Sequence, residues 1–471
     1  MAEQRDLRRT LQLRDLVLFN IVAVIGLRWL ATSARTGPSA LVLWLLAAVF
    51  FFVPQGLAVI ELSSRFPNEG GIYVWTRRAL GEGHGFLCGW CYWINNVLYY
   101  PNLLISTAVI ATYIVGKGGS SLGESWAYVL PTTLVALWLA TTLNVIGVGT
   151  GKWLQNLGGV GTYLPGAILI ALGAAAAFAR KPANAITPAT VVPDLGNYAE
   201  LNLWASIAFA FAGLELSSTM GDEVHDAART LPKSIYIAAP LVAAIYILGT
   251  GALLWLVPAG EIHLVAGFLQ AITAGAGNLG SGFAWLPAVC ALSYTVGTLG
   301  GVGAWLAGPA RVAFAIGLDR YFPPQFGRVH PRFHTPYVAI LVQAGLGTLF
   351  LFVSVLGRGT TVEKAYLILL DTQLLIYFIP YVYLFVSFLI HRRRGGSQPG
   401  VVTVPGGTAG ALAVGLSGLA ITVFAMVVAM IPPPDTADRW VFEAKVVGGA
   451  AAFIALGGVI YWRARPRKPQ Q

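Results

Sequence analysis

Twelve runs of about 20 predominantly apolar residues follow one another along this chain, each long enough to cross the hydrocarbon core of a bilayer as a helix. A backbone in lipid must satisfy its own hydrogen bonds, and runs of this length do so as helices. Charged residues make up only 11% of the chain, against about 25% in soluble domains. We therefore predict an all-α integral membrane protein. The runs lie near residues 16–34, 38–62, 86–115, 127–147, 157–179, 200–221, 235–257, 283–308, 336–357, 362–390, 408–430 and 440–462.

Lysine and arginine are distributed unevenly between the segments that join these runs. With the N-terminus placed inside, the inner segments hold 21 of these residues, whereas the outer segments and span ends hold eight. Because positive residues favour the cytoplasmic side, we expect a multi-pass protein of the cell (inner) membrane with both termini cytoplasmic. The same bias accounts for the net charge of +10, so no nucleic-acid partner is inferred from it.

The segment Phe209–Glu223, FAFAGLELSSTMGDE, places a carboxylate inside an apolar run. An acidic side chain at the bilayer centre costs about 2.5–3.5 kcal/mol on insertion scales, so Glu215 needs a reason to be there. Gly213, two residues earlier, weakens a continuous helix. A broken helix with a carboxylate at the break is typical of a substrate or ion site in a transporter. The alternative is that Glu215 only bonds a neighbouring helix.

Sequence signatures of enzymes and metal sites are missing from the chain. It contains no Walker A motif, no GxGxxG that opens a helix and no HExxH. The histidines are scattered, and no metal-ligand cluster is visible among them. We expect no enzymatic activity, no cofactor and no metal. The histidines are His84, His225, His263, His330, His334 and His391.

Three long segments together carry a family resemblance. The first is ELSSRFPNEGGIYVW, from Glu61, followed by GFLCGWCYW at 85–93. The second is FAFAGLELSSTMGDEVHDAARTLPKSI, from Phe209, and the third covers residues 297–337. In this order and spacing they resemble the second-to-third span, the sixth span and the eighth span of the amino acid–polyamine–organocation permeases, each with its adjoining loop.

The resemblance implies a leucine-transporter-type fold of twelve transmembrane helices. Spans 1–5 and 6–10 would form a 5+5 inverted repeat, with spans 1 and 6 unwound around the substrate and two helices following. Gly26 and Gly213 occupy matching places in the two halves, which agrees with paired breaks. The expected segments are a cytoplasmic N-terminus (1–15), the first repeat (16–180), the second repeat (200–390), a cytoplasmic connector (391–407), helices 11–12 (408–462) and a cytoplasmic C-terminus (463–471).

The first span departs from the family pattern. Its members usually carry Gly-Ser-Gly there, whereas this chain has VAVIGLRWLATSA, with Gly26 retained and Leu27-Arg28 following. An arginine at this depth needs a partner or a water-filled cavity. Arg28 can bind a substrate carboxylate through its two-pronged guanidinium, pair with Glu215 across the facing breaks, or reach toward one surface as a structural residue. The sequence leaves these three interpretations open.

Other site residues follow from positions that match the family. Asn96, in the third span, would contact the substrate, although an interhelical hydrogen bond explains it equally well. Phe209 would close over the substrate, while Val24 and Ala212 would present backbone carbonyls at the breaks. Further candidates in the eighth span are Ser293, Tyr294 and Trp305. Asp371, in the tenth span, is another carboxylate inside an apolar run, and the sequence assigns it no partner. The predicted substrate-binding set is Val24, Gly26, Arg28, Asn96, Phe209, Ala212 and Gly213, with Glu215 as the proton-coupling residue.

These features together predict a secondary active transporter of amino acids or related amines that works by alternating access. Arg28 near a cation site would oppose sodium, which favours proton coupling or exchange, and it favours acidic amino acids as substrates. One alternative is a neutral or cationic amino acid or polyamine permease with an internal Arg28–Glu215 pair. Another is a nutrient sensor of the same fold that does not transport. The expected partners are a small-molecule substrate, the lipid bilayer and protons.

Overall fold

The computed structural model describes residues 7–116, 121–179, 181–194, 196–356, 362–395, 400–431 and 439–464. The side chains of 148–150, 199, 354–372, 442 and 445 are not described. Helices are the only extended regular elements of this part of the chain, apart from an isolated bridge between Leu11 and Val224. Ten of its helical segments are long and apolar enough to cross a membrane. The fold class predicted from the sequence is thereby confirmed.

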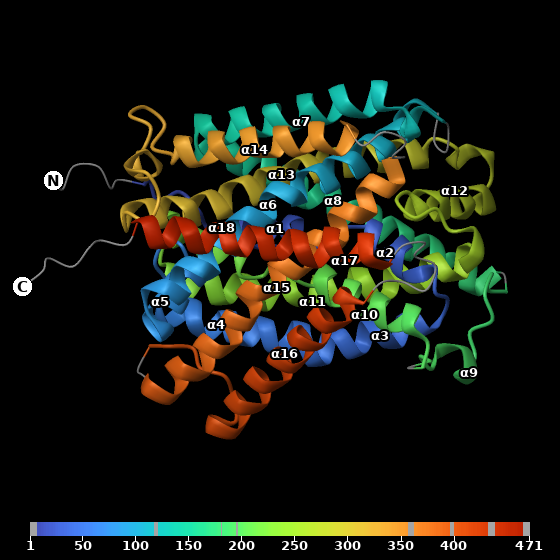
Figure 1. The fold of residues 1–471 in the computed structure, drawn as a ribbon. Coiled ribbons are helices and arrows are strands. Elements are labelled where there is room, and N and C mark those ends of the chain that lie inside the picture. Colours follow the sequence, from blue (N-terminus) through green and yellow to red (C-terminus); the bar gives the residue numbers. More distant parts are fainter. Residues whose placement is uncertain are drawn as a thin grey trace, which may run out of the picture.

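The helices run side by side along one axis (Figure 1). The first five predicted spans correspond to α1 (Leu13–Val24) with α2 (Arg28–Ala34), α3 (Ser39–Ala47) with η1 (Ala48–Phe52) and α4 (Val53–Arg65), α6 (Glu82–Ala111), α7 (Trp126–Ile146) and α8 (Val148–Ala179). The next five correspond to α10 (Tyr198–Ala210) with η4 (Leu216–Glu223), α11 (Ala227–Leu256), α13 (Leu286–Leu318), α14 (Tyr337–Leu356) and α15 (Val362–Gly395). The last two correspond to α16 (Gly407–Met430) and to α17 (Arg439–Glu443) with η8 (Ala444–Gly448) and α18 (Gly449–Ala464).

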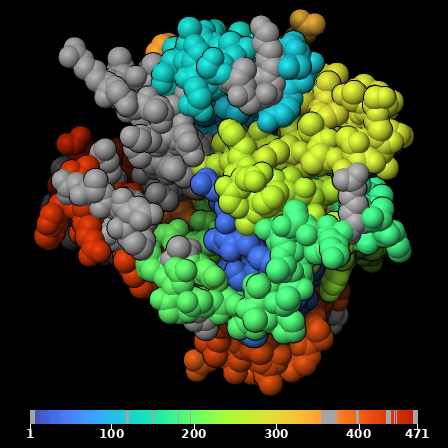
Figure 2. Space-filling model, turned by 90° about the vertical axis from the view of Figure 1, so that its right-hand side faces the viewer, coloured from blue at the N-terminus to red at the C-terminus, as the bar shows by residue number. Residues whose placement is uncertain are grey.

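Short elements cover the two ends of the bundle. The chain enters α1 and leaves α18 at the same end, on the left of Figure 1, which we call the terminal end. At the opposite end lie α9 and α12, and Figure 2 shows blue N-terminal atoms surfacing there between green and yellow-green segments. The short elements are α5 (Ile72–Leu80), η2 (Thr112–Val115), η3 (Ser121–Glu124), α9 (Pro188–Val191), η5 (Ala259–Glu261), α12 (Gly267–Leu279), η6 (Ser281–Phe283) and η7 (Pro324–Gly327).

The first and sixth spans are interrupted where the sequence predicts breaks. In the first span α1 ends at Val24, Ile25 is extended, and α2 starts at Arg28. In the sixth span α10 ends at Ala210, and Gly213 has a φ of +130°, which a side chain would strain. The chain then continues as the 3₁₀ helix η4 rather than as an α-helix. Both breaks leave backbone groups outside any helix, near the centre of the bundle.

Glycines let α8 and α13 pack against each other without intervening side chains. A Cβ atom on Gly158 would lie 2.6 Å from the Cα of Gly300, and one on Gly161 would lie 2.5 Å from the carbonyl oxygen of Ser293. Small residues at such contacts allow close backbone approach, which stabilises helix pairs in lipid. This pair supports α1, which also packs on both helices, and so helps to hold the first break in place.

Candidate functional site

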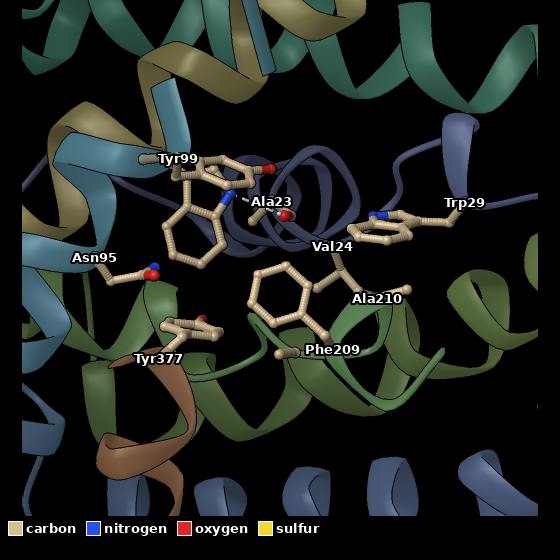
Figure 3. A pocket seen from close by; sticks show the side chains of 10 residues that line it. Ala23, Val24, Trp29, Asn95, Tyr99, Phe209, Ala210 and Tyr377 are labelled. Carbon is tan, nitrogen blue, oxygen red and sulfur yellow. Dashed lines mark hydrogen bonds between the residues drawn. The ribbon is translucent and has the colours of Figure 1, made fainter. Parts of the chain in front are cut away.

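A cavity with about 310 Å³ of space free of protein atoms lies between the two helix breaks (Figure 3). Its wall is made by the two interrupted spans together with α6, α13 and α15. The lining residues are Ala23, Val24, Trp29, Asn95, Tyr99, Phe209, Ala210, Ala212, Trp305 and Tyr377.

Aromatic rings dominate the cavity wall. Phe209 meets Trp29 edge-on with 5.7 Å between ring centroids and Tyr377 with 5.5 Å. On the other side Trp305 lies 5.2 Å from Tyr99 and 5.8 Å from Tyr377. Figure 3 shows the rings of Trp29, Tyr99, Phe209 and Tyr377 around a common space, with the side chain of Asn95 at its edge. Such a wall offers ring faces to a cation and apolar contact to a carbon chain.

Trp305 is fixed by hydrogen bonds to both sides of the cavity. Its indole Nε1 donates to the carbonyl oxygen of Ala23 at 3.0 Å, the dashed line in Figure 3. Its own carbonyl oxygen accepts from the hydroxyl of Tyr100 at 2.7 Å and from Nε2 of Gln343 at 3.3 Å. The ring therefore ties α13 to the end of α1, and its orientation does not depend on packing alone.

Tyr246, on α11, joins the two breaks. Its hydroxyl accepts a hydrogen bond from the amide of Gly26 at 3.0 Å. The same hydroxyl lies 2.6 Å from the carbonyl oxygen of Val24 and 3.1 Å from that of Ala210, and it donates its one proton between them. One side chain thus satisfies backbone groups that both interruptions expose.

Glu215 is completely buried just after the break in the sixth span and accepts four hydrogen bonds from uncharged groups. Oε1 accepts from the hydroxyls of Tyr92 at 3.0 Å and Tyr377 at 2.8 Å. Oε2 accepts from the hydroxyl of Tyr381 at 2.5 Å and from Nε2 of Gln55 at 3.2 Å. These donors satisfy the carboxylate without requiring a cation.

The hydroxyl of Tyr381 gives this network a direction. It accepts from the amide of Gly213 at 2.7 Å and from Nε2 of Gln55 at 3.1 Å, which fills its lone pairs. Its proton is then left for Oε2 of Glu215. Glu215 therefore anchors the break of the sixth span to α4, α6 and α15.

Arg28 is buried at the start of α2, directly behind the cavity wall. Its guanidinium carbon lies 5.1 Å from the ring centroid of Trp29 and 5.8 Å from that of Tyr99, and both rings line the cavity. Arg28 is not among the described residues that line the cavity. A guanidinium over two aromatic faces is stabilised by cation–π attraction.

The predicted site residues fall into three groups. Val24, Phe209 and Ala212 line the cavity, and so does Trp305. Gly26 and Gly213 lie in the breaks, where their amides bond the hydroxyls of Tyr246 and Tyr381. Arg28 and Glu215 lie behind the wall, as described above.

Asn96 and the remaining candidates lie away from the cavity or outside the described part. Nδ2 of Asn96 donates to the carbonyl oxygen of Tyr92 within α6 at 2.8 Å, whereas the neighbouring Asn95 lines the cavity. Oδ1 of Asn95 is buried without a hydrogen-bond partner among the described residues, so it is available to a ligand. Oγ of Ser293 donates to the carbonyl oxygen of Gly161 at 3.2 Å, and Tyr294 is buried in α13. The side chain of Asp371 lies outside the described residues.

A buried charge cluster closes the terminal end below the site. Nη2 of Arg311 donates to both carboxylate oxygens of Glu223, at 2.9 and 3.0 Å, and Nε lies 3.7 Å from Oε1 of Glu69. Burial and the negative charge of Glu223 raise the pKa of the Glu69 carboxyl well above its ordinary value, although Arg311 opposes the shift.

The segment before α1 seals the same end. The amides of Thr10 and Leu11 donate to the carbonyl oxygen of Glu223 at 2.9 and 3.1 Å. The amide of His225 returns a bond to the carbonyl oxygen of Leu11 at 3.0 Å. In this structure the chain before the first span is therefore bonded to the end of the sixth span and to the residues that follow it.

Within the described residues, no group of three His, Cys, Asp or Glu side chains is placed to hold a metal ion. The polar atoms around the cavity are amides, carbonyls, hydroxyls and one guanidinium behind the wall. This set suits an organic ligand with both an ammonium and a carboxyl or other polar end.

Comparison with known proteins shows which family the chain belongs to. The model of the amino acid permease family matches residues 11–460. The chain is 31% identical over 450 residues to an uncharacterised transporter of Legionella pneumophila, covering 95% of both proteins. It is 23% identical over 398 residues to a glutamate/gamma-aminobutyrate antiporter of Lactococcus lactis, covering 84% of this chain and 78% of the relative. It is 28% identical over 382 residues to a serine/threonine exchanger of Bacillus subtilis, covering 80% of each.

Proposed function

Because this chain belongs to the amino acid permease family, we propose that it exchanges small amino acids or related amines across the membrane by alternating access. Family and relatives place it among membrane transporters rather than enzymes. The observation that carries the finer proposal is the aromatic-lined cavity between the two breaks. Its ring faces and the polar groups beside them fit a compact substrate.

The two ends of an amino acid have different places to bind in this cavity. An ammonium group is attracted to the faces of Trp305, Tyr377 and Phe209, and Oδ1 of Asn95 offers it an acceptor. A carboxylate is attracted to the guanidinium of Arg28, which lies behind the rings of Trp29 and Tyr99. A simple amine would use the first of these contacts alone.

Exchange is favoured over proton coupling by the hydrogen bonds of Glu215. Protonation of this carboxylate would make one of its donors face another donor, which costs the bond and leaves a buried group unsatisfied. Substrate exchange needs no such change at each cycle. Proton coupling through Glu215 is the competing proposal, and it predicts transport driven by a pH gradient.

Acidic amino acids form a second substrate class, favoured by the position of Arg28. Its guanidinium is separated from the cavity by the rings of Trp29 and Tyr99. A rotation of either ring would open a path between the guanidinium and the cavity. The guanidinium would then hold a side-chain carboxylate with two hydrogen bonds. Neutral or cationic substrates would leave these rings in place.

The same proposal includes the topology of the chain. Residues 16–180 and 200–390 form two inverted repeats, each contributing one interrupted span, and the terminal end faces the cytoplasm. Alternating access then requires that the Arg311–Glu223 contact and the bonds of Thr10 and Leu11 open when the site turns to that side. A sensor that binds without moving substrate is the alternative of another class.

Counterflow in proteoliposomes tests the proposal. Vesicles are loaded in separate batches with glutamate, serine, arginine or putrescine. Each batch is then placed in a solution of its own compound in labelled form, with pH and ion composition matched on both sides of the membrane. Uptake of label only into vesicles that hold the protein and an internal substrate supports exchange. Binding in detergent without any counterflow would identify a sensor, and neither binding nor counterflow with any amino acid or amine would refute the proposed substrate class.

A further inference from the structure

A second and larger groove lies between the C-terminal end of α15 and the N-terminal end of α16. Figure 1 shows both helix ends at the terminal end of the bundle. It holds about 1,120 Å³ of space free of protein atoms. It shares no lining residue with the substrate cavity, although α15 contributes to both. The lining residues are Leu389, Ile390, Arg392, Arg393, Thr408, Ala411 and Leu412.

The packing of the two helices explains why the groove opens there. Further along α16, Gly415 and Gly418 press against Leu389 and Phe385, because a Cβ atom at either glycine would overlap these side chains. The helices therefore touch along this stretch. Towards the terminal end the contact ends, and Leu412, which is 46% exposed, faces outward from the bundle beside the groove.

The rim of the groove is positively charged. Of the three consecutive arginines that end α15, Arg392 donates to Oε2 of Glu61 at 2.9 Å and is thereby held in place. Glu61 is shared with Arg65, so one carboxylate serves two guanidinium groups. Arg393 is exposed and has no carboxylate partner among the described residues. The rim therefore carries an excess of positive charge.

We propose that this groove binds one anionic phospholipid, with its phosphate on Arg393 and Arg392 and an acyl chain along Leu389 and Leu412. The groove lies where a span ends in basic residues, which is the depth of lipid headgroups. Basic pockets between helices at this level recognise anionic headgroups. The exposed Leu412, beside the half-buried Leu389, favours a lipid over a soluble phosphate, because a soluble anion would leave this apolar surface in water. Thr408 adds a hydroxyl for the headgroup.

Native mass spectrometry of the full chain tests the proposal. The protein is purified in detergent and titrated with phosphatidylglycerol, with phosphatidylcholine of the same chains, and with glycerol 3-phosphate as a soluble anion. The variants are Arg393→Gln, which removes the free charge, and Leu412→Trp, which fills the groove from an exposed position. The matched control is Arg463→Gln, because Arg463 is an exposed arginine in the last turn of another helix, α18, outside the groove.

The expected result is one phosphatidylglycerol retained in preference to phosphatidylcholine by the wild type and by Arg463→Gln. Arg393→Gln should lower the affinity about fivefold, as expected for one arginine near a lipid surface. Leu412→Trp should abolish retention at unchanged charge. Equal retention of both lipids, equal losses in Arg393→Gln and Arg463→Gln, or full competition by glycerol 3-phosphate would overturn the proposal.

Discussion

Replacing Glu215 by glutamine separates an anchoring role from a proton-carrying role. The carboxylate accepts two hydrogen bonds on each oxygen. Glutamine keeps one acceptor oxygen, but its NH₂ group must face two groups that are themselves donors. Hydrogen bonds to a charged group are each worth about 1.5–3 kcal/mol, so losing two costs roughly 3 kcal/mol at the low end. That corresponds to more than a hundredfold change in the equilibrium that holds the break of the sixth span in shape.

The consequence for transport follows from where these bonds act. If Glu215 anchors the break, Glu215→Gln should lose counterflow of every substrate, because the cavity wall formed by Phe209 and Ala212 adjoins the released segment. Its apparent melting temperature in detergent should also fall by several degrees. If Glu215 carries the coupled proton, counterflow should persist while uptake driven by a pH gradient disappears.

Both assays are made on the same proteoliposome preparation, with Glu261→Gln as the control. Glu261 is an exposed glutamate in η5, so its replacement changes the same charge without touching the site. Normal counterflow and an unchanged melting temperature in Glu215→Gln would refute the anchoring role.

Three further variants test the structure around the site. Tyr246→Phe removes the hydroxyl that bonds the amide of Gly26, and we expect at least a tenfold weaker substrate affinity, measured by ligand titration; an unchanged affinity would show that the breaks do not need this bond. Arg28→Lys keeps the charge but not the two-pronged fork, so glutamate should lose about tenfold more affinity than serine if acidic substrates reach Arg28; a parallel loss for both would exclude them. Glu69→Gln tests the raised pKa of Glu69 at the terminal end. The native protein holds the proton of this carboxyl more tightly than the unfolded chain does. Protonated Glu69 therefore contributes its full stability below the unfolded pKa of about 4.5, and this contribution is lost as the pH rises through the raised native pKa. Glutamine cannot ionise, so the variant does not lose this stability. Between pH 5 and 8 its melting temperature, relative to that of the wild type, should rise by a few degrees. A difference in melting temperature that does not change with pH would contradict the raised pKa of Glu69.

The sequence predicted the backbone of the site better than its polar contacts. The breaks at Gly26 and Gly213 were predictable because a glycine beside a charge inside an apolar run has few structural explanations. Phe209 was predicted to close over the substrate because it matches a family position, and the structure places it on the cavity wall. The sequence could not show which groups bond Glu215, because the four donors come from spans that are distant along the chain. These donors are Gln55, Tyr92, Tyr377 and Tyr381.

Tyrosines in apolar helices give no sequence signal of their role. The ring of Tyr246 packs on Trp44 like an ordinary core residue, with 4.4 Å between centroids, and only its hydroxyl distinguishes it. The adjacent residues Asn95 and Asn96 differ by about 100° around α6, a rotation that decides which one faces the cavity. An error of one residue in the predicted orientation of a helix is therefore enough to assign the wrong side chain to the cavity.

Ligand-induced thermal stabilisation tests most directly whether the aromatic cavity is the substrate site. The wild type is compared with Phe209→Leu, which removes one ring from the cavity, and with Phe50→Leu, which makes the same change at an exposed position on η1. A ligand that binds the native state raises its stability in proportion to the logarithm of concentration over Kd. We predict that the amino acids or amines that stabilise the wild type also stabilise Phe50→Leu, but bind Phe209→Leu about tenfold more weakly. Equal stabilisation of all three proteins would show that the substrate binds elsewhere.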